Sequence, residues 1–394
     1  MQTIQIADGC SQVTSGATPS RKKPEYFIGD IPWLKTKELN DALIGGTEEH
    51  ISESALAETS CKLIPAGAVV IAMYGATVGK LGILGTPMTT NQACCAMVAD
   101  EVSLHSQYLF YWLLQNRQSI INLSNGAAQQ NLSVRTIKNI ALKIPTLEKQ
   151  IRTADALKSL DDKIAANQLA IHKIQELLHA QWHAITNTGV SSTEPISSIA
   201  DVNPRTSKPQ SDECSFLEMK DLPEYGLIVD RWGKRETKGG TKFRNVDVLL
   251  ARITPCFENG KMAIVDFLED DEVGMGSTEY IVFRPKEDIP AAAIHAIISS
   301  PEFRSFGYKA LTGTSGRQRI AADDLKEIAV PWPPESALTE YRQLADVLLK
   351  KATALRNENQ VLARTRDELL PLLMSGRITV GEAEDAADEA TSES

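Results

Sequence analysis

The sequence contains no uninterrupted apolar stretch long enough to cross a membrane. A membrane-spanning helix needs about 18 consecutive apolar residues, and the longest candidate, residues 66–84, is broken by glycine and lysine. The first eleven residues hold no basic segment followed by an apolar run, so we expect no signal peptide. The six cysteines form no Cys-x-x-Cys pair, which favours a reduced, cytoplasmic compartment over a disulfide scaffold.

The sequence also lacks a complete catalytic or metal-binding motif. Residues 75–80 resemble a phosphate-binding loop, but the segment is one residue short and Leu81 stands where Ser or Thr would reach magnesium. His179 and His183 have the spacing of a zinc-protease helix without its glutamate. Nucleophile elbows, dinucleotide-binding fingerprints and the Asn-Pro-Pro-aromatic turn of adenine methyltransferases are missing. We therefore predict that the chain has no catalytic residues, binds no metal and holds no cofactor.

Basic residues are in deficit, and the deficit is unevenly distributed. The formal net charge is −10. Residues 1–147 and 148–185 are each neutral, residues 186–337 carry −6, and residues 338–378 carry +2. The last segment, residues 379–394, carries six acids and no base, so we expect a disordered acidic tail. Charge therefore neither requires nor excludes a nucleic-acid partner.

An internal repeat organises the rest of the chain. The recurring pairs of segments are Ile6-Ala7-Asp8 with Ile199-Ala200-Asp201, Val69-Val70-Ile71-Ala72 with Val248-Leu249-Leu250-Ala251, Gly79-Lys80 with Gly260-Lys261, and residues 137–141 with residues 325–329. A period near 190 residues is too long for a solenoid and indicates two copies of a mixed α/β unit, each followed by a long helix. The predicted layout is a first globular domain at 1–147, a long helix at 148–185, a linker at 186–195, a second globular domain at 196–337, a second long helix at 338–378, and the tail at 379–394.

Both helical segments carry an apolar residue at every seventh position. The seam residues are Leu157, Ile164, Ile171 and Leu178 in the first segment, and Leu348, Leu355, Leu362 and Leu369 in the second. A sustained heptad pattern predicts a coiled coil, in which the polar positions Asn167 and Glu358 would fix the register. The alternative is that each helix packs only on its own domain. The predicted fold class is therefore α+β, with two similar mixed α/β domains separated by two long helices that form an antiparallel coiled coil with pseudo-twofold symmetry.

Candidate binding residues occur first in two equivalent loops that follow buried-strand segments. These residues are Tyr74, Thr77 and Lys80 in the first copy, and Arg252, Thr254, Asn259 and Lys261 in the second. Lysine and arginine neutralise phosphates, and hydroxyl and amide groups bond phosphates or base edges. The alternative is a pair of ordinary hairpins with solvated lysines.

A second candidate is a strongly basic segment within the acidic second copy. Its cations are Arg231, Lys234, Arg235, Lys238, Lys242 and Arg244, with Trp232 and Phe243 interleaved. Such a cluster is typical of a phosphate-binding surface. A solvated hairpin would give the same composition.

The third candidate is a pair of polar triplets that align between the copies. Gln129-Gln130-Asn131 corresponds to Arg317-Gln318-Arg319. Gln and Asn pair with adenine in the major groove and Arg pairs with guanine, so the two copies would read different sequences. Loop polarity alone also explains both triplets.

At this point the sequence resembles the specificity subunits of type I restriction–modification enzymes. The matching segments are residues 63–80, Thr90-Asn91-Gln92, residues 144–150, residues 247–255, residues 258–261 and residues 276–279. Their order, repeated in both copies, carries the resemblance over about residues 1–378. The second copy departs from the pattern at residues 331–343, where the entry to its helix is longer.

The resemblance implies a DNA-binding subunit without catalytic activity. Each target recognition domain would read one half of a bipartite, asymmetric site in double-stranded DNA, and the helix pair would set the gap between the halves. Two modification subunits would supply S-adenosylmethionine and methylate adenine, and restriction subunits would use ATP and magnesium. The alternatives are a stand-alone bipartite DNA-binding regulator and a coiled-coil scaffold that binds no DNA; only DNA binding through phosphates weakens steeply with salt.

Overall fold

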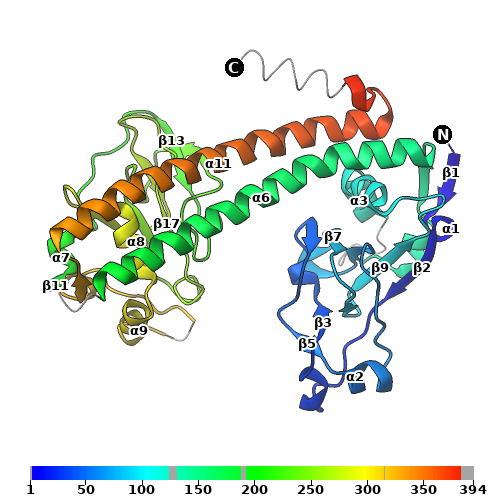
Figure 1. Cartoon of the computed structure of the whole chain (residues 1–394), viewed down its shortest axis with the longest axis horizontal. Helices are drawn as coiled ribbons and strands as arrows, with labels where there is room; N and C mark the ends of the chain where they lie inside the picture. The colour runs from blue at the N-terminus through cyan, green and yellow to red at the C-terminus, as the bar shows by residue number, and fades with distance from the viewer. Residues whose placement is uncertain (1, 124–130, 188–191, 315, 383–394) are drawn as a thin grey trace. The chain divides into compact units, whose positions relative to one another are not determined.

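The chain folds into two compact units, each containing one half of both long helices (Figure 1). The computed structural model describes residues 2–123, 131–187, 192–314 and 316–382. Unit 1 comprises Met1–Lys163 and Val361–Ser394, and unit 2 comprises Ile164–Gln360. Among the described residues, no helix is both long and apolar enough to span a lipid bilayer.

Unit 1 is built around a five-stranded sheet of order β2-β9-β6-β7-β4. A three-stranded sheet, β5-β3-β8, and a two-stranded sheet, β1-β10, accompany it. The elements are β1 (Gln2–Gln5), α1 (Ile6–Gly9), β2 (Cys10–Ser15), β3 (Ile31–Leu34), β4 (Ala42–Ile44), β5 (His50–Ile51), α2 (Glu53–Glu58), β6 (Val69–Ala72), β7 (Leu81–Leu84), β8 (Thr89–Thr90), β9 (Cys94–Ala99), α3 (Ser106–Gln115), α4 (Arg117–Asn122), α5 (Val134–Lys138) and β10 (Ala141–Ile144), with 3-10 helices η1 (Pro24–Phe27), η2 (Thr36–Glu38) and η3 (Gly75–Thr77).

Unit 2 repeats this plan with two four-stranded sheets and a two-stranded sheet. The orders are β12-β19-β16-β17, β14-β13-β18-β15 and β11-β20. The elements are β11 (Ser192–Pro195), α7 (Ile196–Ile199), β12 (Ala200–Val202), β13 (Glu213–Leu217), β14 (Gly233–Glu236), β15 (Thr241–Phe243), β16 (Val248–Ala251), β17 (Met262–Ile264), β18 (Gly274–Gly276), β19 (Tyr280–Pro285), α8 (Ala291–Ser299), α9 (Pro301–Lys309), α10 (Asp323–Lys326) and β20 (Ala329–Trp332).

The predicted internal repeat is confirmed by strand pairing. β1 pairs with β10 ahead of one long helix, and β11 pairs with β20 ahead of the other. In both units a central buried strand, β6 or β16, lies between a following antiparallel strand and a later one. The last four residues of the predicted linker, Ser192–Pro195, are strand β11, since their register with β20 makes them part of unit 2.

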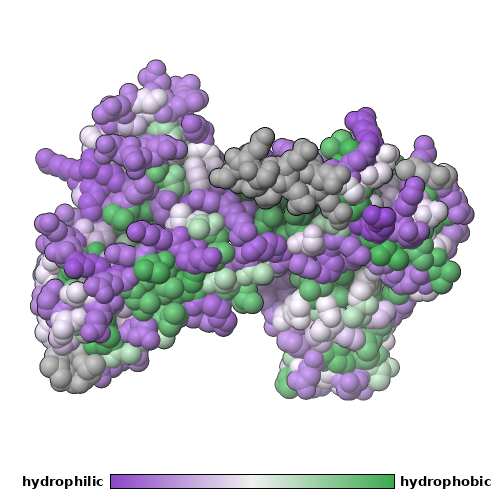
Figure 2. All heavy atoms as spheres, turned by 45° about the horizontal axis from the view of Figure 1, so that its top comes forward, coloured by the Kyte–Doolittle hydropathy of each residue, from purple (hydrophilic) through white to green (hydrophobic). Residues whose placement is uncertain are grey.

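The central strands explain why short, continuously apolar segments recur at these positions. Side chains alternate between the two faces of a strand, so Val69 and Ile71 belong to one core of unit 1 while Val70 and Ala72 belong to another. The equivalent strand β16 likewise divides its side chains between two cores of unit 2. A strand buried on both faces has no position for a polar residue. Polar residues cover much of the face drawn in Figure 2, with smaller hydrophobic patches between them.

The long helices α6 (Leu147–Thr186) and α11 (Glu335–Ser375) pack together as the predicted antiparallel pair. In unit 2, the Asn167 Nδ2 atom donates to Glu358 Oε2 at 2.8 Å and to Asn359 Oδ1 at 2.9 Å. Farther along, the Tyr341 hydroxyl donates to the Leu178 carbonyl at 3.3 Å. The two polar seam positions predicted from the heptads are therefore direct partners.

The helix halves also complete the core of each unit. Ala154 and Leu157 of α6 join Leu370 and Leu373 of α11 in a core of unit 1. In unit 2 the buried hydrophobic residues are Ile174, Leu178 and Trp182 of α6, and Leu338, Tyr341, Ala345, Ala352 and Leu355 of α11. Of the eight predicted seam residues, Leu157, Leu178 and Leu355 are buried, whereas Ile164, Ile171, Leu348, Leu362 and Leu369 are partly buried. Alanine and aromatic residues take the remaining buried positions because the helices pack on globular cores as well as on each other.

A buried arginine joins the part of α11 that lies in unit 2 to the globular core of that unit. The Arg356 Nη1 atom donates to Asp266 Oδ1 at 2.7 Å and to the Val229 carbonyl at 3.0 Å. Thr353 donates to the other oxygen of Asp266 at 2.7 Å. Burial raises the pKa of Asp266, and the Arg356 charge opposes that rise. The pair stabilises unit 2 only as long as both partners are present.

A buried histidine pair joins α6 to α8. The His295 Nε2 atom lies 2.8 Å from the Gly226 carbonyl, which accepts only, so Nε2 carries the proton. The His295 Nδ1 atom is then the acceptor for His179 Nε2 at 3.0 Å. Burial, and then the neighbouring His179, lower the pKa of His295 to about 3, and burial lowers the pKa of His179. The arrangement therefore requires the His295 ring to be neutral.

We expect Arg356→Met to lower the free energy of unfolding by about 3 kcal/mol, since it leaves the Asp266 carboxylate without its guanidinium. Urea denaturation of the full chain measures the loss. The control is Lys350→Met, which removes an exposed cation from the same helix and should change the value by less than about 0.5 kcal/mol. Equal effects of the two changes would contradict the anchoring role of Arg356.

We expect unit 2 to lose stability below about pH 6.5. The pKa of His295 is lower in the folded chain than in the unfolded chain, so the unfolded state takes up the proton first as the pH falls. The contribution is fully present above about pH 6.5 and is reduced by about 2 kcal/mol at pH 5. Unfolding measured at both pH values in the wild type and in His295→Gln isolates this term. The same pH dependence in both proteins would refute it.

Candidate nucleic-acid interface

The structure brings the last residue of each predicted triplet, Asn131 or Arg319, beside the predicted loop of the same unit. In unit 1, the Leu132 amide donates to the Met73 carbonyl at 2.9 Å, which places Asn131 beside the loop that carries Tyr74 and Thr77. In unit 2, the Ile320 amide donates to the Arg252 carbonyl at 3.0 Å. The equivalent hydrogen bond supports the alignment of the two triplets, which the chain separates by about 60 residues from their loops.

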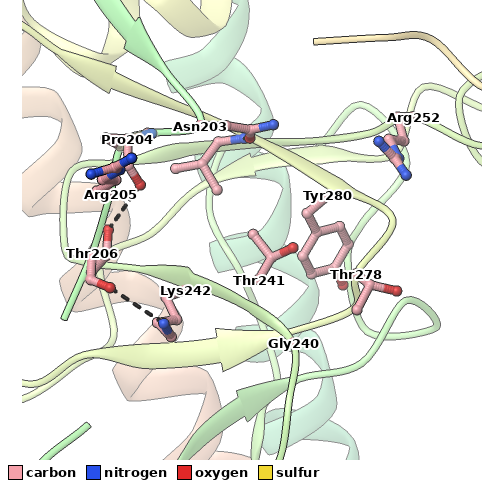
Figure 3. Close-up of a pocket in the computed structure, with 11 residues that line it drawn as sticks. Asn203, Pro204, Arg205, Thr206, Gly240, Thr241, Lys242, Arg252, Thr278 and Tyr280 are labelled. Carbon is pink, nitrogen blue, oxygen red and sulfur yellow. Dashed lines mark hydrogen bonds between the residues drawn. The ribbon is translucent and has the colours of Figure 1, made fainter. Parts of the chain in front are cut away.

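A hollow of about 510 Å³ in unit 2 gathers three cations from separate segments (Figure 3). Its eleven lining residues are Asn203, Pro204, Arg205, Thr206, Gly240, Thr241, Lys242, Arg252, Thr278, Tyr280 and Val282. Hydroxyl groups and an amide accompany the cations, and no carboxylate is among the eleven. Residues 186–337 carry a net charge of −6, so the lining of this hollow is positively charged within a segment that is negatively charged as a whole.

Beside the hollow, one carboxylate holds two arginines. Glu279 accepts from Arg319 Nη2 at 2.8 Å and Nε at 3.0 Å, and its Oε2 atom accepts from Arg252 Nε at 3.1 Å. The hydrogen bond from Arg319, together with that from Arg252, lowers the pKa of Glu279 despite partial burial. The carboxylate is therefore ionised at neutral pH and fixes both guanidinium groups.

The predicted basic segment 231–244 does not form one continuous surface. Lys242 lines the hollow of Figure 3, where it donates to the Thr206 carbonyl at 3.4 Å. Arg231, Lys234 and Arg235 line a different hollow of about 320 Å³. The other cations of the segment, Lys238 and Arg244, are exposed, and Lys238 pairs with Glu236.

The two aromatic side chains of that segment pack in or against the core and do not form a platform on which DNA bases could stack. Phe243 is fully buried, and Trp232 stacks on Phe267 with ring centroids 4.4 Å apart. Phe243 points inward from β15, whereas Trp232 precedes β14 and is partly buried.

Two residues of the second loop have structural roles that differ from the predicted one. Lys261 donates to the carbonyls of Met219 and Leu222, both at 2.9 Å, so its ammonium closes a turn of the backbone. Thr254 is buried, and its hydroxyl accepts from the Gln318 amide at 3.0 Å. Both side chains are used inside the protein, which leaves Arg252 and the exposed Asn259 as the loop's outward candidates.

The recurring Gly-Lys pair is explained by turn geometry. Gly79 and Gly260 have φ angles of 82° and 71°, a region that favours glycine. A Cβ atom at Gly260 would lie 2.4 Å from the Tyr225 ring. The following lysines are equivalent in the backbone, but Lys80 pairs with Asp41 at 2.9 Å, which also binds Arg117.

The predicted residues of unit 1 are therefore only partly assembled. Tyr74 is 39% exposed, Thr77 is partly exposed, and Asn131 is exposed. Gln129 and Gln130 lie outside the described residues. Lys80 is half exposed but shares the Asp41 carboxylate.

Sequence reasoning missed several residues that shape the interface of unit 2. Arg205 is a single cation in a loop without any repeating pattern, and nothing in the sequence marks it. Arg304 of α9 is buried against the Phe257 ring at 3.9 Å and donates to the Glu258 carbonyl at 3.3 Å, so it holds the loop from beneath. Glu279 lies in the segment that carries the family resemblance, which was the available signal. Nowhere in the described chain do three His, Cys, Asp or Glu side chains gather closely enough to hold a metal ion.

Comparison with known proteins identifies the same group of relatives by sequence and by fold. A profile described as type I restriction modification DNA specificity domain matches residues 1–176. The MjaIX type I restriction enzyme specificity subunit of Methanocaldococcus jannaschii is 24% identical over 94% of this chain and 92% of its own length. The EcoEI specificity subunit of Escherichia coli is 33% identical, but over 36% of this chain and only 25% of its own length.

A solved structure shares the fold over nearly the whole chain. The S subunit of the type I restriction–modification system of M. genitalium superposes with a TM-score of 0.56 at 12% identity, covering 94% of this chain and 95% of that one. The likeness covers both units and both long helices, which the profile alone does not reach. Over nearly its whole length the chain is therefore similar to the specificity subunits of type I restriction–modification enzymes.

Proposed function

We propose that unit 1 and unit 2 each read one half of a bipartite, asymmetric DNA site. The hollow of unit 2 is the observation that carries this proposal, because three cations without a carboxylate face one concave surface in an acidic segment. Arginine and lysine side chains bind phosphates, whereas hydroxyl and amide groups bond phosphates and base edges. The fit to duplex DNA comes from this combination of charge and polar groups.

The two halves of the site differ in sequence because equivalent positions carry different side chains. The backbone places Asn131 of unit 1 where unit 2 has Arg319, and Met73 where unit 2 has Arg252. Asn favours adenine and Arg favours guanine. The site is therefore asymmetric although the two units share a fold.

The helix pair sets the gap between the half-sites. A helix of 40 residues, the length of α6, spans about 60 Å. That length corresponds to about 18 base pairs of B-DNA. The seam contact of Asn167 with Glu358 favours one register, and hence one gap.

The chain contributes recognition and leaves catalysis to its partners. Two modification subunits bind S-adenosylmethionine and methylate adenine, and restriction subunits use ATP and magnesium. Exposed apolar side chains on the long helices, such as Leu169 and Val347, support docking of these proteins. The six free cysteines suit a cytoplasmic location. A stand-alone regulator or a scaffold without DNA binding is less favoured, since relatives that span the chain are specificity subunits.

A tagged full-length chain recovered from its native host at moderate salt tests the proposal. We expect two copies of a methyltransferase per chain by native mass spectrometry, and a bipartite pattern of adenine methylation in the host genome. Deletion of the gene should abolish that methylation. Recovery of the chain without a methyltransferase, or methylation that survives the deletion, would contradict the proposal.

Replacing Arg205 and Lys242 together by Gln should weaken binding to duplexes of any sequence. Each cation that contacts a phosphate adds about one unit to the slope of log affinity against log salt, so the slope should fall by about two. Fluorescence anisotropy across a salt series measures both quantities. The matched control replaces Lys309 and Lys350, two exposed cations of unit 2 outside the hollow, and should leave the slope unchanged. Equal slopes for the two double variants would remove the hollow from the interface.

A further inference from the structure

Two equivalent backbone hydrogen bonds define the same local frame in each of the two units. In each unit, one bond joins the residue after the central strand to the residue that precedes β9 or β19. The other bond joins the same residue to the triplet segment. In unit 1 the bonds run from Met73 N to Ala93 O at 2.8 Å and from Leu132 N to Met73 O at 2.9 Å; in unit 2 they run from Arg252 N to Glu279 O at 2.9 Å and from Ile320 N to Arg252 O at 3.0 Å. The strand registers agree, since Ala72 faces Cys94 in unit 1 and Ala251 faces Tyr280 in unit 2.

This frame identifies three equivalent positions whose chemistry differs completely. Unit 1 carries Met73, Ala93 and Asn131, and unit 2 carries Arg252, Glu279 and Arg319. Met73 is fully buried, whereas the side chain of Arg252 is 33% exposed and lines the hollow. A charged trio is thus built onto a backbone that unit 1 uses for packing.

Within the trio, Arg252 keeps most of its hydrogen-bonding capacity. Of the Arg252 nitrogens, only Nε donates a hydrogen bond to Glu279. In the part of the chain that the structure describes, no hydrogen bond or ion pair engages Nη1 or Nη2 of Arg252. Arg319, by contrast, uses Nε and Nη2 on Glu279 and Nη1 on the Arg317 carbonyl at 3.3 Å.

We infer that Arg252 reads one guanine in the half-site of unit 2, and that Glu279 is the positioning residue that aims it. The inference rests on the proposed function and deepens it. Two parallel donors on one guanidinium match O6 and N7 at the major-groove edge of guanine. Arg252 presents such a pair because its backbone is bonded on both sides and its Nε atom is anchored.

The carboxylate itself argues for a base edge over a phosphate as the partner of Arg252. A glutamate beside a phosphate-binding arginine repels the phosphate, so a surface selected for affinity alone would omit it. The phosphate contacts are assigned to the other side of the hollow, where Arg205 and Lys242 lie and no carboxylate lines the surface (Figure 3). Orientation of Arg252 is the benefit that offsets this repulsion.

The test uses the full chain in its complex with the modification subunits and a library of duplexes randomised over both half-sites. We expect the wild type to select a bipartite motif with a fixed guanine in one half. Arg252→Gln and Arg252→Lys should lose that one guanine, with a fall in discrimination of roughly tenfold to a hundredfold. The other half-site and the gap should stay unchanged in both variants. Arg252→Lys keeps the positive charge, so loss of the guanine there separates base reading from general attraction.

Glu279→Gln should relax the same position and no other, which a purely structural role would not produce. The matched control is Lys309→Gln, which removes an exposed cation of α9 outside the hollow and should leave every position of the motif intact. An unchanged motif in Arg252→Gln, or loss of the same guanine in Lys309→Gln, overturns the inference and leaves the proposed function standing. A wild-type complex that selects no motif overturns the proposed function itself.

Discussion

Both units depend on the pairing of two helical segments that are far from each other in sequence. Asn167 and Glu358, which are 191 residues apart, bond in unit 2, and Asp161 and Arg366, which are 205 residues apart, bond in unit 1. Each core is closed by one part of α6 and one part of α11, so unit 1 needs two separate stretches of chain, whereas unit 2 is one continuous stretch whose two ends pack together. The cost of closing such long loops rises only slowly with length. Burial of residues such as Leu157 and Leu355 then stabilises the pairing.

The buried central strands hold the backbone at their ends in the same positions in both units, while the side chains at those positions differ. β6 and β16 are buried on both faces, which fixes the backbone positions just beyond their ends. Residues at those ends meet the triplet segments through identical hydrogen bonds, yet one unit carries Met73 and the other Arg252. Sequence preference can therefore change by substitution at a few loop positions while the cores remain the same.

The sequence predicts the elements that have strong periodic patterns. It does not predict the role of a side chain where that role depends on which hydrogen-bond partners the fold supplies. The heptads and the repeat predict the helix pair, and even the polar contact of Asn167 with Glu358. Lys261 and Thr254 look like phosphate contacts because their residue types suit that role, but the folded chain uses both on its own backbone. Glu279 could not be singled out because its function depends on two arginines, 27 and 40 residues away, that only the fold brings to it.

The local charge of a surface, and not the net charge of the chain, determines where an acidic protein binds DNA. At physiological salt the screening length is about 8 Å, so an acidic group beyond that distance has little influence on a phosphate at the hollow. Arg205, Lys242 and Arg252 line one concave surface of about 510 Å³ without a lining carboxylate, and Glu279 pairs with Arg252 beside it. The acids of residues 186–337 then disfavour other orientations of the duplex, because they repel it wherever the hollow does not face it. Under the proposed function, the net charge of −10 contributes to recognition because it disfavours encounters away from the cationic surface.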